Sequence, residues 1–356
     1  MADFDQLKLA VEGISGGKNT ILLDDAGMPS YMVRVPQLKY SDVIDGGTQD
    51  VLDAFILNGN ALDYIYIGKY QSSVTNGRAY SLPFKDPQTS VNFDTVRSYC
   101  RAKGTGWHLQ TNALWAAIAL WCKKNGTMPN GNNNYGADIS SPYEKGMRSY
   151  PATGTVSRTA TGSGPNTWYH DYNNATGIAD MNGNGWEWCG GLRLVGGEIQ
   201  IIPYGNAMQD IYSGEQDIQG ANSTLWQAVM PDGTFVAPGT DGTLKWDYAA
   251  SKITLATTIT TQADVNRYTN FELLGSATGV TAPQVLKGLG LHPADADGYL
   301  TDNAWMNNGD GLERLPYRGG YWSTGVAAGL FALNFYDPRS RTSSSVGFRS
   351  AFYGNV

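Results

Sequence analysis

The sequence predicts an α+β domain, on three observations. Residues 31–38 (YMVRVPQL) and 63–71 (DYIYIGKYQ) alternate apolar and polar side chains and are rich in β-branched and aromatic residues, a pattern typical of strands. Residues 92–104 and 111–126 follow with helical periodicity. After Gly126 the chain is rich in Gly, Asn, Ser and Thr, which indicates short strands between long loops. Helices that precede a run of strands favour α+β over an alternating α/β order.

The two helices carry recognisable ends. We expect the first to begin at Asp94 as N-cap and to end at Lys103-Gly104. We expect the second to begin at Thr111 or Asn112 and to end before Gly126. Its predicted buried stripe consists of Leu114, Ile118, Trp121 and Cys122.

Composition excludes several classes of function. The net charge is -7 and the few basic residues are scattered, so neither nucleic acid nor an anionic membrane is an expected partner. No apolar run approaches the roughly 20 residues of a membrane span, so we expect no membrane insertion. The N-terminus lacks the basic start and apolar core of a secretory signal, so we expect no export by the general secretory route.

The cysteines and histidines predict neither a metal site nor a cofactor. The chain has three cysteines, Cys100, Cys122 and Cys189, and three histidines, His108, His170 and His292. Their spacing in the sequence is not that of metal ligands. Two of the cysteines lie in apolar helical patterns, where a buried free thiol is expected.

Three motifs in order resemble one family. They are GTGWHLQTNALWAAIALW (104–121), ADMNGNGWEWCGGLRL (179–194) and RGGYW with VGFRSA (318–322 and 346–351). Together they resemble the C-type lectin-like fold, as built in formylglycine-generating-enzyme-like proteins and in the variable proteins of diversity-generating retroelements. The resemblance covers residues 30–205 and 312–356. It implies two helices, short antiparallel strands, long loops and an insertion.

Domain boundaries follow from where the resemblance stops. Residues 1–28 are predicted to be an N-terminal attachment or oligomerisation segment, because Leu7 to Val11 is amphipathic. Residues 29–356 would form the lectin-like domain, with an insertion at about 206–311 and a variable region at about 318–350.

The motif residues themselves are expected to build the scaffold. On a strand, Trp186 and Trp188 would both enter the core, and Gly183, Gly185, Gly319 and Gly320 suit positive φ or close backbone approach. Arg318 and Arg349 are expected to bind backbone carbonyls or carboxylates. The predicted scaffold set is Trp186, Trp188, Arg318, Gly319, Gly320, Trp322, Gly347, Phe348 and Arg349.

The sequence lacks the residues required for two functions found among proteins of this fold, namely enzymatic activity and calcium-dependent sugar binding. Enzymes of the formylglycine-generating type resemble copper-dependent oxidases with two cysteines in the C-terminal segment, and residues 312–356 contain no cysteine. Related iron-dependent enzymes use a histidine cluster, which three separated histidines do not supply. Calcium-dependent lectins share a Glu-Pro-Asn or Gln-Pro-Asp tripeptide and a Trp-Asn-Asp tripeptide, none of which occurs here. We therefore expect no enzyme and no catalytic residue.

The resemblance to retroelement variable proteins is supported by an absence of residue types. In those systems the targets are Asn codons of the AAY type, which mutate to NNY and so never encode Lys, Glu, Gln, Met or Trp. Residues 323–356 contain none of the five. About five would be expected there from their frequency of roughly one in seven elsewhere.

Alignment to the familiar variable repeat gives the candidate ligand-binding positions. Eleven fall in the NNY set, and Val326 is added as a twelfth although the repeat usually has Ala there. The twelve are Tyr321, Ser323, Thr324, Val326, Ala327, Asn334, Tyr336, Asp337, Arg341, Ser343, Ser344 and Ser345. Phe335, Pro338 and Arg339 depart from the commonest repeat, which leaves their status open.

The sequence thus predicts a metal-independent protein that binds a protein or glycan ligand on a cell surface. Tyr321 and Tyr336 would be rigid anchors, and Asp337 and Arg341 would supply charge. The twelve positions should be exposed and should form one shallow surface. We expect a phage or prophage receptor-binding protein, in a phage tail or on a bacterial surface, with a second copy of the chain as a candidate partner in a homo-oligomer. The alternative is a structural virion component or bacterial adhesin of the same fold without diversification.

Overall fold

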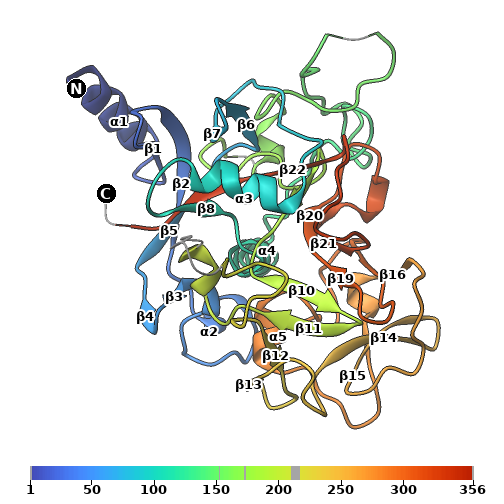
Figure 1. The fold of residues 1–356 in the computed structure, drawn as a ribbon. Helices are drawn as coiled ribbons and strands as arrows, with labels where there is room; N and C mark the ends of the chain where they lie inside the picture. The colour runs from blue at the N-terminus through green and yellow to red at the C-terminus, as the bar shows by residue number, and fades with distance from the viewer. Residues whose placement is uncertain (1, 152, 172–173, 210–216, 355–356) are drawn as a thin grey trace.

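The computed structural model describes residues 2–151, 153–171, 174–209 and 217–354 (Figure 1). Its α-helices are α1 (Ala2–Ile14), α2 (Tyr40–Val43), α3 (Phe93–Arg101), α4 (Asn112–Asn125) and α5 (Gln284–Gly288). Among the described helices, none is both long enough and apolar enough to cross a bilayer. Most of the remaining chain forms short strands and loops.

One sheet joins the beginning of the chain to its end. Its strands are paired antiparallel in the order β1 (Asn19–Leu23), β2 (Pro29–Pro36), β5 (Tyr64–Gly68), β23 (Ser350–Phe352) and β8 (Trp107–Leu109). Strand β5 lies within the predicted stretch 63–71, and β2 overlaps the predicted stretch 31–38 but begins two residues before it. Because β23 lies between β5 and β8, the last strand of the chain completes this sheet.

The second sheet carries the C-terminal region. Its order is β16 (Arg267–Asn270), β18 (Asn303–Met306), β21 (Gly329–Phe335), β20 (Tyr317–Gly319), β9 (Trp186–Trp188) and β22 (Val346–Phe348). The pairs β18–β21 and β9–β22 are parallel, and the other pairs are antiparallel. Strands β16 and β18 come from the segment 206–311 and extend this sheet at its edge.

The same segment also supplies strands to a third sheet, seen at the lower right in Figure 1. Its main path is β13 (Phe235–Val236), β12 (Gln227–Val229), β11 (Glu198–Ile201), β14 (Lys245–Ala249), β15 (Lys252–Ala256) and β17 (Gly275–Ser276). Strand β10 (Leu192–Val195) pairs with β11 and with β19 (Glu313–Arg314). Two hairpins stand apart, namely β3 (Ile56–Leu57) with β4 (Asn60–Ala61), and β6 (Ser72–Thr75) with β7 (Arg78–Ser81).

Helix α4 lies at the centre of the molecule (Figure 1). Its Thr111 N-cap accepts a hydrogen bond from the Leu114 amide at 3.2 Å, and Gly126 closes it with φ +66°. The sequence predicted one apolar stripe, but the helix is buried almost all round, and Trp121 of that stripe is only half-buried. A helix packed against several layers buries its whole circumference, which a single stripe does not describe.

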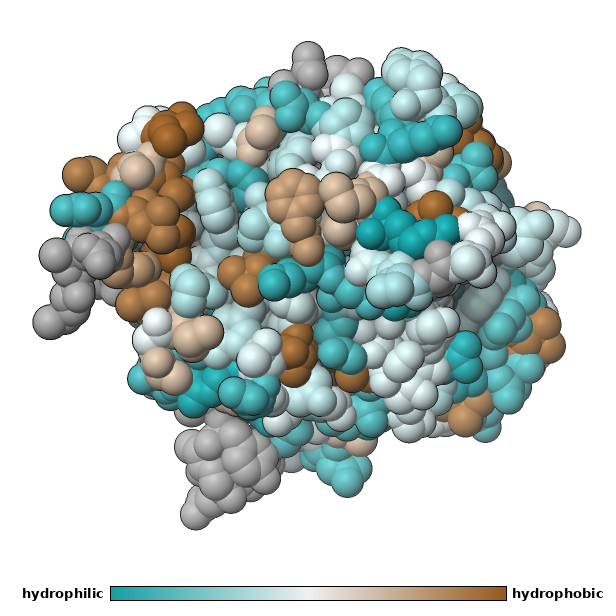
Figure 2. Space-filling view, turned by 90° about the horizontal axis from the view of Figure 1, so that it is seen from above, coloured by the Kyte–Doolittle hydropathy of each residue, from teal (hydrophilic) through white to brown (hydrophobic). Residues whose placement is uncertain are grey.

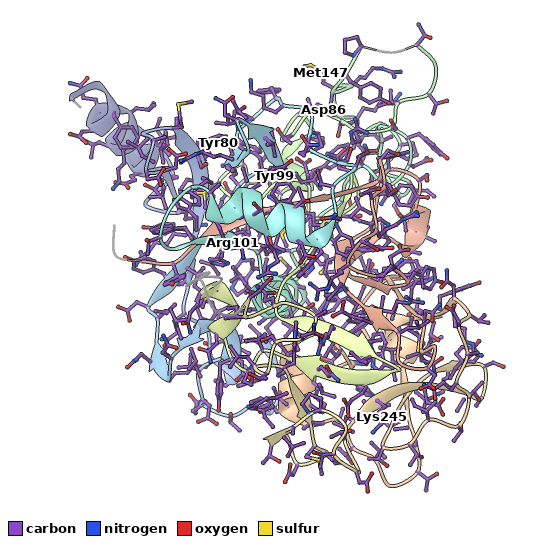
Figure 3. All side chains as sticks on the ribbon, in the orientation of Figure 1. Tyr80, Asp86, Tyr99, Arg101, Met147 and Lys245 are labelled. Atoms are coloured by element: carbon purple, nitrogen blue, oxygen red, sulfur yellow. The ribbon has the colours of Figure 1, made fainter. Side chains whose placement is uncertain are left out.

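Helix α3 begins two residues earlier than predicted. Asn92, and not Asp94, is the N-cap, because the Asn92 Oδ1 accepts a hydrogen bond from the Thr95 amide at 2.9 Å. Asp94 instead lies in the first turn, where a carboxylate favours the positive end of the helix dipole. Tyr99 of this helix, labelled in Figure 3, packs with its ring centroid 6.4 Å from that of Phe348.

Helix α1 extends from one end of the molecule (Figure 1). It is attached by Glu12, whose Oε1 accepts a hydrogen bond from Thr20 Oγ1 at 2.6 Å. Leu7, Leu9 and Ile14 are exposed, and Figure 2 shows apolar residues gathered on this side.

A buried ion pair connects the first two sheets. Arg349 and Glu187 are both fully buried, and the Arg349 Nε and Nη2 donate to the two Glu187 oxygens at 3.0 and 2.7 Å. The remaining donors of Arg349 reach the carbonyls of Gly68, Lys69 and Ala179, each at 2.9 Å. The expectation that Arg349 binds carbonyls and a carboxylate is confirmed. Fully bonded buried charges fix geometry, since any displacement leaves a charge unpaired.

We predict that Arg349→Met lowers the free energy of unfolding by about 3–5 kcal/mol, because it leaves the Glu187 carboxylate buried without its partner. Arg341→Met is the control, since Arg341 is exposed and its Nε lies 3.7 Å from an Asp337 oxygen. Its effect should stay within about 0.5 kcal/mol. Urea denaturation of the three proteins measures both; equal effects would contradict the structural role of Arg349.

A second prediction concerns Asp180, which is buried beside this pair. Burial raises the pKa of the Asp180 carboxyl to about 6. Its Oδ2 accepts from the Gly162 amide at 2.7 Å, and its Oδ1 has no hydrogen-bond partner among the described residues. Because the folded-state pKa is raised, protonation stabilises the fold at low pH, and this stabilisation is lost as pH rises through 6.

The Asp180→Asn variant cannot titrate at this position. Between pH 7.5 and pH 4.5 the wild type should therefore gain about 2 kcal/mol of stability relative to the variant. Denaturation curves of both proteins across this range give the difference. A difference that does not change with pH would show that the Asp180 carboxyl titrates at its ordinary value.

Candidate ligand-binding surface

The scaffold residues hold the C-terminal strands from below the candidate surface. Arg318 on β20 is fully buried, and it donates to Asn112 Oδ1 at 2.9 Å and to the carbonyls of Leu289 and Gly290 at 3.0 and 3.1 Å. Its burial lowers its pKa to about 10. As with Arg349, the predicted bonding to carbonyls is confirmed. Trp186 and Trp188 are buried on β9, also as expected.

Glycines fix the backbone where β20 ends. Gly319 has φ +95°, and a Cβ there would lie 2.7 Å from the Met181 carbonyl oxygen. Gly320 has φ +87°, and its Cβ would lie 2.5 Å from that of Ala328. A Cβ at Gly347 would lie 2.6 Å from the Gln88 carbonyl oxygen. Gly185 differs from expectation, because its φ is not positive and a Cβ would make ordinary contacts there.

The twelve candidate positions lie on two loops and one strand end. Tyr321, Ser323, Thr324, Val326 and Ala327 are in the loop 320–328, which joins β20 to β21. Asn334 is near the end of β21, and the others are in the loop 336–345, which leads to β22. We expected all twelve to be exposed, but only Val326, Arg341 and Ser344 are, and eight others are half-buried.

Asn334 is the exception. It is buried, with 6% of its surface exposed, and its Oδ1 accepts a hydrogen bond from the Tyr336 amide at 2.8 Å. The side chain therefore shapes the beginning of the loop 336–345 and contributes little exposed surface. A pattern of codon types does not reveal this burial, which depends on the pairing of β21 with β18 and β20.

The first part of the surface combines both loops at one end of the sheet. Arg158 donates from Nη1 to the Ser344 carbonyl at 3.3 Å, and its guanidinium lies 5.9 Å from the Trp322 ring centroid. Asp86 holds Arg158 through two bonds of 3.0 Å. Figure 3 shows Asp86 at the end of the molecule away from Lys245. The structure thus brings residues 321–327 and 343–345 together.

The second part of the surface lies at the other end of β21. Asp337 accepts a hydrogen bond from the Tyr317 hydroxyl, and Arg341 Nε lies 3.7 Å from an Asp337 oxygen. Burial raises the pKa of the Tyr336 hydroxyl above its usual value, and the nearby Tyr268 phenol adds to the rise. Seven residues of β21 separate the two parts, so the candidate positions form an elongated band and not one compact patch.

Sequence reasoning did not find the residues that hold the long loop. Arg339 donates from Nε and Nη2 to Glu313 at 2.7 and 2.9 Å, and from Nη1 to Asp94 at 2.8 Å. It also donates to the Gln219 carbonyl at 3.1 Å. The departure of Arg339 from the usual repeat was the one signal of its role. Arg158 lies in a Gly- and Ser-rich stretch that offered none.

The described residues contain no group of three or more His, Cys, Asp or Glu placed to hold a metal ion. The three cysteines are buried, and burial raises the pKa of the Cys122 and Cys189 thiols. Burial lowers the pKa of His108 and His170 to about 4. None of these side chains belongs to the C-terminal band.

Comparison with known proteins identifies the framework. Residues 28–197 match the family described as Sulfatase-modifying factor enzyme 1-like domain. A search of curated proteins finds no relative by sequence.

Among solved structures, the chain is similar to Treponema denticola variable protein 1 (12% identity, TM-score 0.35, covering 94% of this chain and 98% of that one). It is also similar to the Major Tropism Determinant M1 variant (10%, 0.33, 94% and 71%) and to PvdO from Pseudomonas aeruginosa (15%, 0.30, 94% and 97%). No conclusion about function follows from similarities of this size. The family match covers just under half of the chain, and it confirms the resemblance drawn from the sequence motifs: residues 28–197 are similar to the C-type lectin-like domain of the sulfatase-modifying factor enzyme 1-like family.

Proposed function

We propose that this chain is a ligand-binding protein whose C-terminal surface is diversified by a retroelement. The observation that carries the proposal is the absence of Lys, Glu, Gln, Met and Trp from residues 323–356, the five residue types that NNY codons cannot encode. The ligand is a protein or glycan on a cell surface, and the chain acts as a receptor-binding protein of a phage or prophage.

Frame and surface have separate roles in this proposal. Buried residues such as Arg318, Gly319 and Arg349 hold the strands, whereas the candidate positions other than Asn334 are half-buried or exposed. Loop positions on a rigid frame accept many replacements. Tyr321 and Tyr336 supply large rigid contacts, and the serines and threonines supply adaptable hydrogen bonds.

The proposal assigns no catalytic role to the chain. Residues 312–356 contain no cysteine, so the thiolate chemistry of formylglycine-generating enzymes has no residues here. Residues 1–28, which include the exposed apolar side of α1, serve as the attachment or oligomerisation segment. Residues 206–311 are an insertion within the domain 29–356.

Sequencing the DNA downstream of the gene tests the proposal directly. We expect a near-copy of codons 318–353 beside a reverse transcriptase gene. The copy should have AAY where this protein has the candidate residues, for example at Tyr321, Tyr336, Asp337 and Arg341. A copy that differs at positions other than adenines, or no copy, would favour the structural virion component or undiversified adhesin.

The proposal also requires that a fixed residue hold the varied loop. We predict that Arg339→Ala raises amide hydrogen exchange in the loop 336–345 by about tenfold or more, because the bonds to Glu313 and Asp94 are lost. Arg341→Ala is the matched control and should leave exchange in this loop unchanged, since Arg341 is exposed. Equal exchange in the two variants would count against Arg339 as the fixed support.

A further inference from the structure

Two aromatic residues from outside the variable region lie in register with it. Strand pairing places Tyr268 opposite Trp305, Trp305 opposite Asn334, and Asn334 opposite Tyr317. Residues paired across neighbouring strands point to the same face of a sheet. Tyr268 and Trp305 therefore share a face with Asn334, which lies two residues before Tyr336.

Ring contacts agree with this placement. The Trp305 ring meets the Trp186 ring edge-on, with centroids 5.3 Å apart, and Trp186 meets Tyr317 at 5.1 Å. Trp305 and Tyr321 are half-buried and pack on the cluster that contains Trp186. Trp305 thus lies between the two parts of the elongated band. Tyr268 is 62% exposed, close enough to Tyr336 to raise the pKa of its hydroxyl.

The aromatic and charged composition of this face favours a protein ligand over a small molecule. Small ligands bind in concave pockets, whereas protein interfaces are flatter and use aromatic residues inside a polar rim. The cavity of about 200 Å³ lies elsewhere, lined by Val33, Ile118 and Trp121 among others. A larger one of about 770 Å³ is lined by Tyr204, Leu225 and Phe235 among others. The rings at 268, 305, 321 and 336 are accompanied by hydroxyl groups and by the Asp337–Arg341 pair.

We infer that Tyr268 and Trp305 are fixed members of the ligand-binding surface, which every variant of the protein presents to a folded protein ligand. The inference rests on the proposed function. Both residues lie outside codons 318–353, so diversification leaves them unchanged. They supply constant contact area, and the varied residues beside them decide which protein is bound.

The test uses the full chain displayed on yeast, with NNY codons at the eleven candidate positions other than Asn334, which is kept. The probe is a purified folded protein, lysozyme, with immobilised glycans screened in parallel. In clones that bind lysozyme, Tyr268→Ala should weaken binding at least tenfold. Tyr204→Ala is the matched control, a partly exposed tyrosine beside the larger cavity, and should change binding less than twofold.

Trp305 is half-buried, so Trp305→Leu is compared with Tyr268→Ala only in clones whose thermal unfolding is unchanged. If both variants stay within twofold of the parent while substitutions at 321 to 345 abolish binding, the inference is wrong and the proposed function stands. Binding clones for glycans and none for lysozyme would overturn the ligand class. A library without any binding clone would overturn the proposed function and the inference with it.

Discussion

The arrangement of this protein depends on the buried Arg349–Glu187 pair. Arg349 precedes β23 of the first sheet, Glu187 lies on β9 of the second, and the three carbonyls that Arg349 also binds come from residues 68, 69 and 179. One guanidinium thus joins four separate segments of the chain. A buried charge has few alternatives to its native partners, so this contact specifies how the two sheets meet. The pair thereby also fixes the position of the C-terminal strands.

With increasing distance from this pair, the arginine side chains become more exposed to solvent. Arg318 and Arg349 are fully buried, Arg339 and Arg158 are partly buried and hold loops, and Arg341 is exposed. Arginine therefore has three roles in this protein, and the solvent exposure of each side chain decides which one: it bonds within the core, holds a loop, or lies on the surface. Only the last kind can be replaced freely, because an exposed ion pair contributes little to stability.

Much of the fold and of its scaffold could be predicted from the sequence, because the local signals for these parts were strong. The strands 31–38 and 63–71, both helices, and the bonding of Arg318 and Arg349 follow from periodicity and motif. Features that depend on strand pairing between distant parts of the chain could not be predicted. Asn334 is buried because β21 lies between β18 and β20, and no local pattern in 206–311 reveals that β16 and β18 join that sheet. The N-cap at Asn92 was missed because both Asn92 and Asp94 are good caps, and only the first turn's geometry decides between them.

The parallel relation of β22 to β21 has a consequence for how this region can evolve. Because β22 and β21 both run parallel to β9, the loop 336–345 must travel back along the full length of β21 before β22 begins. Its path is pinned by Arg339 in the middle, and by the bond from the Ser90 amide to the Ser343 carbonyl at 2.9 Å near its end. Ten residues span this return with little slack, so an added or deleted residue would shift the register of β22 and expose its buried face. Variation here is confined to exchanges of side chains at constant length, which is the kind of change that copying a repeat base for base produces.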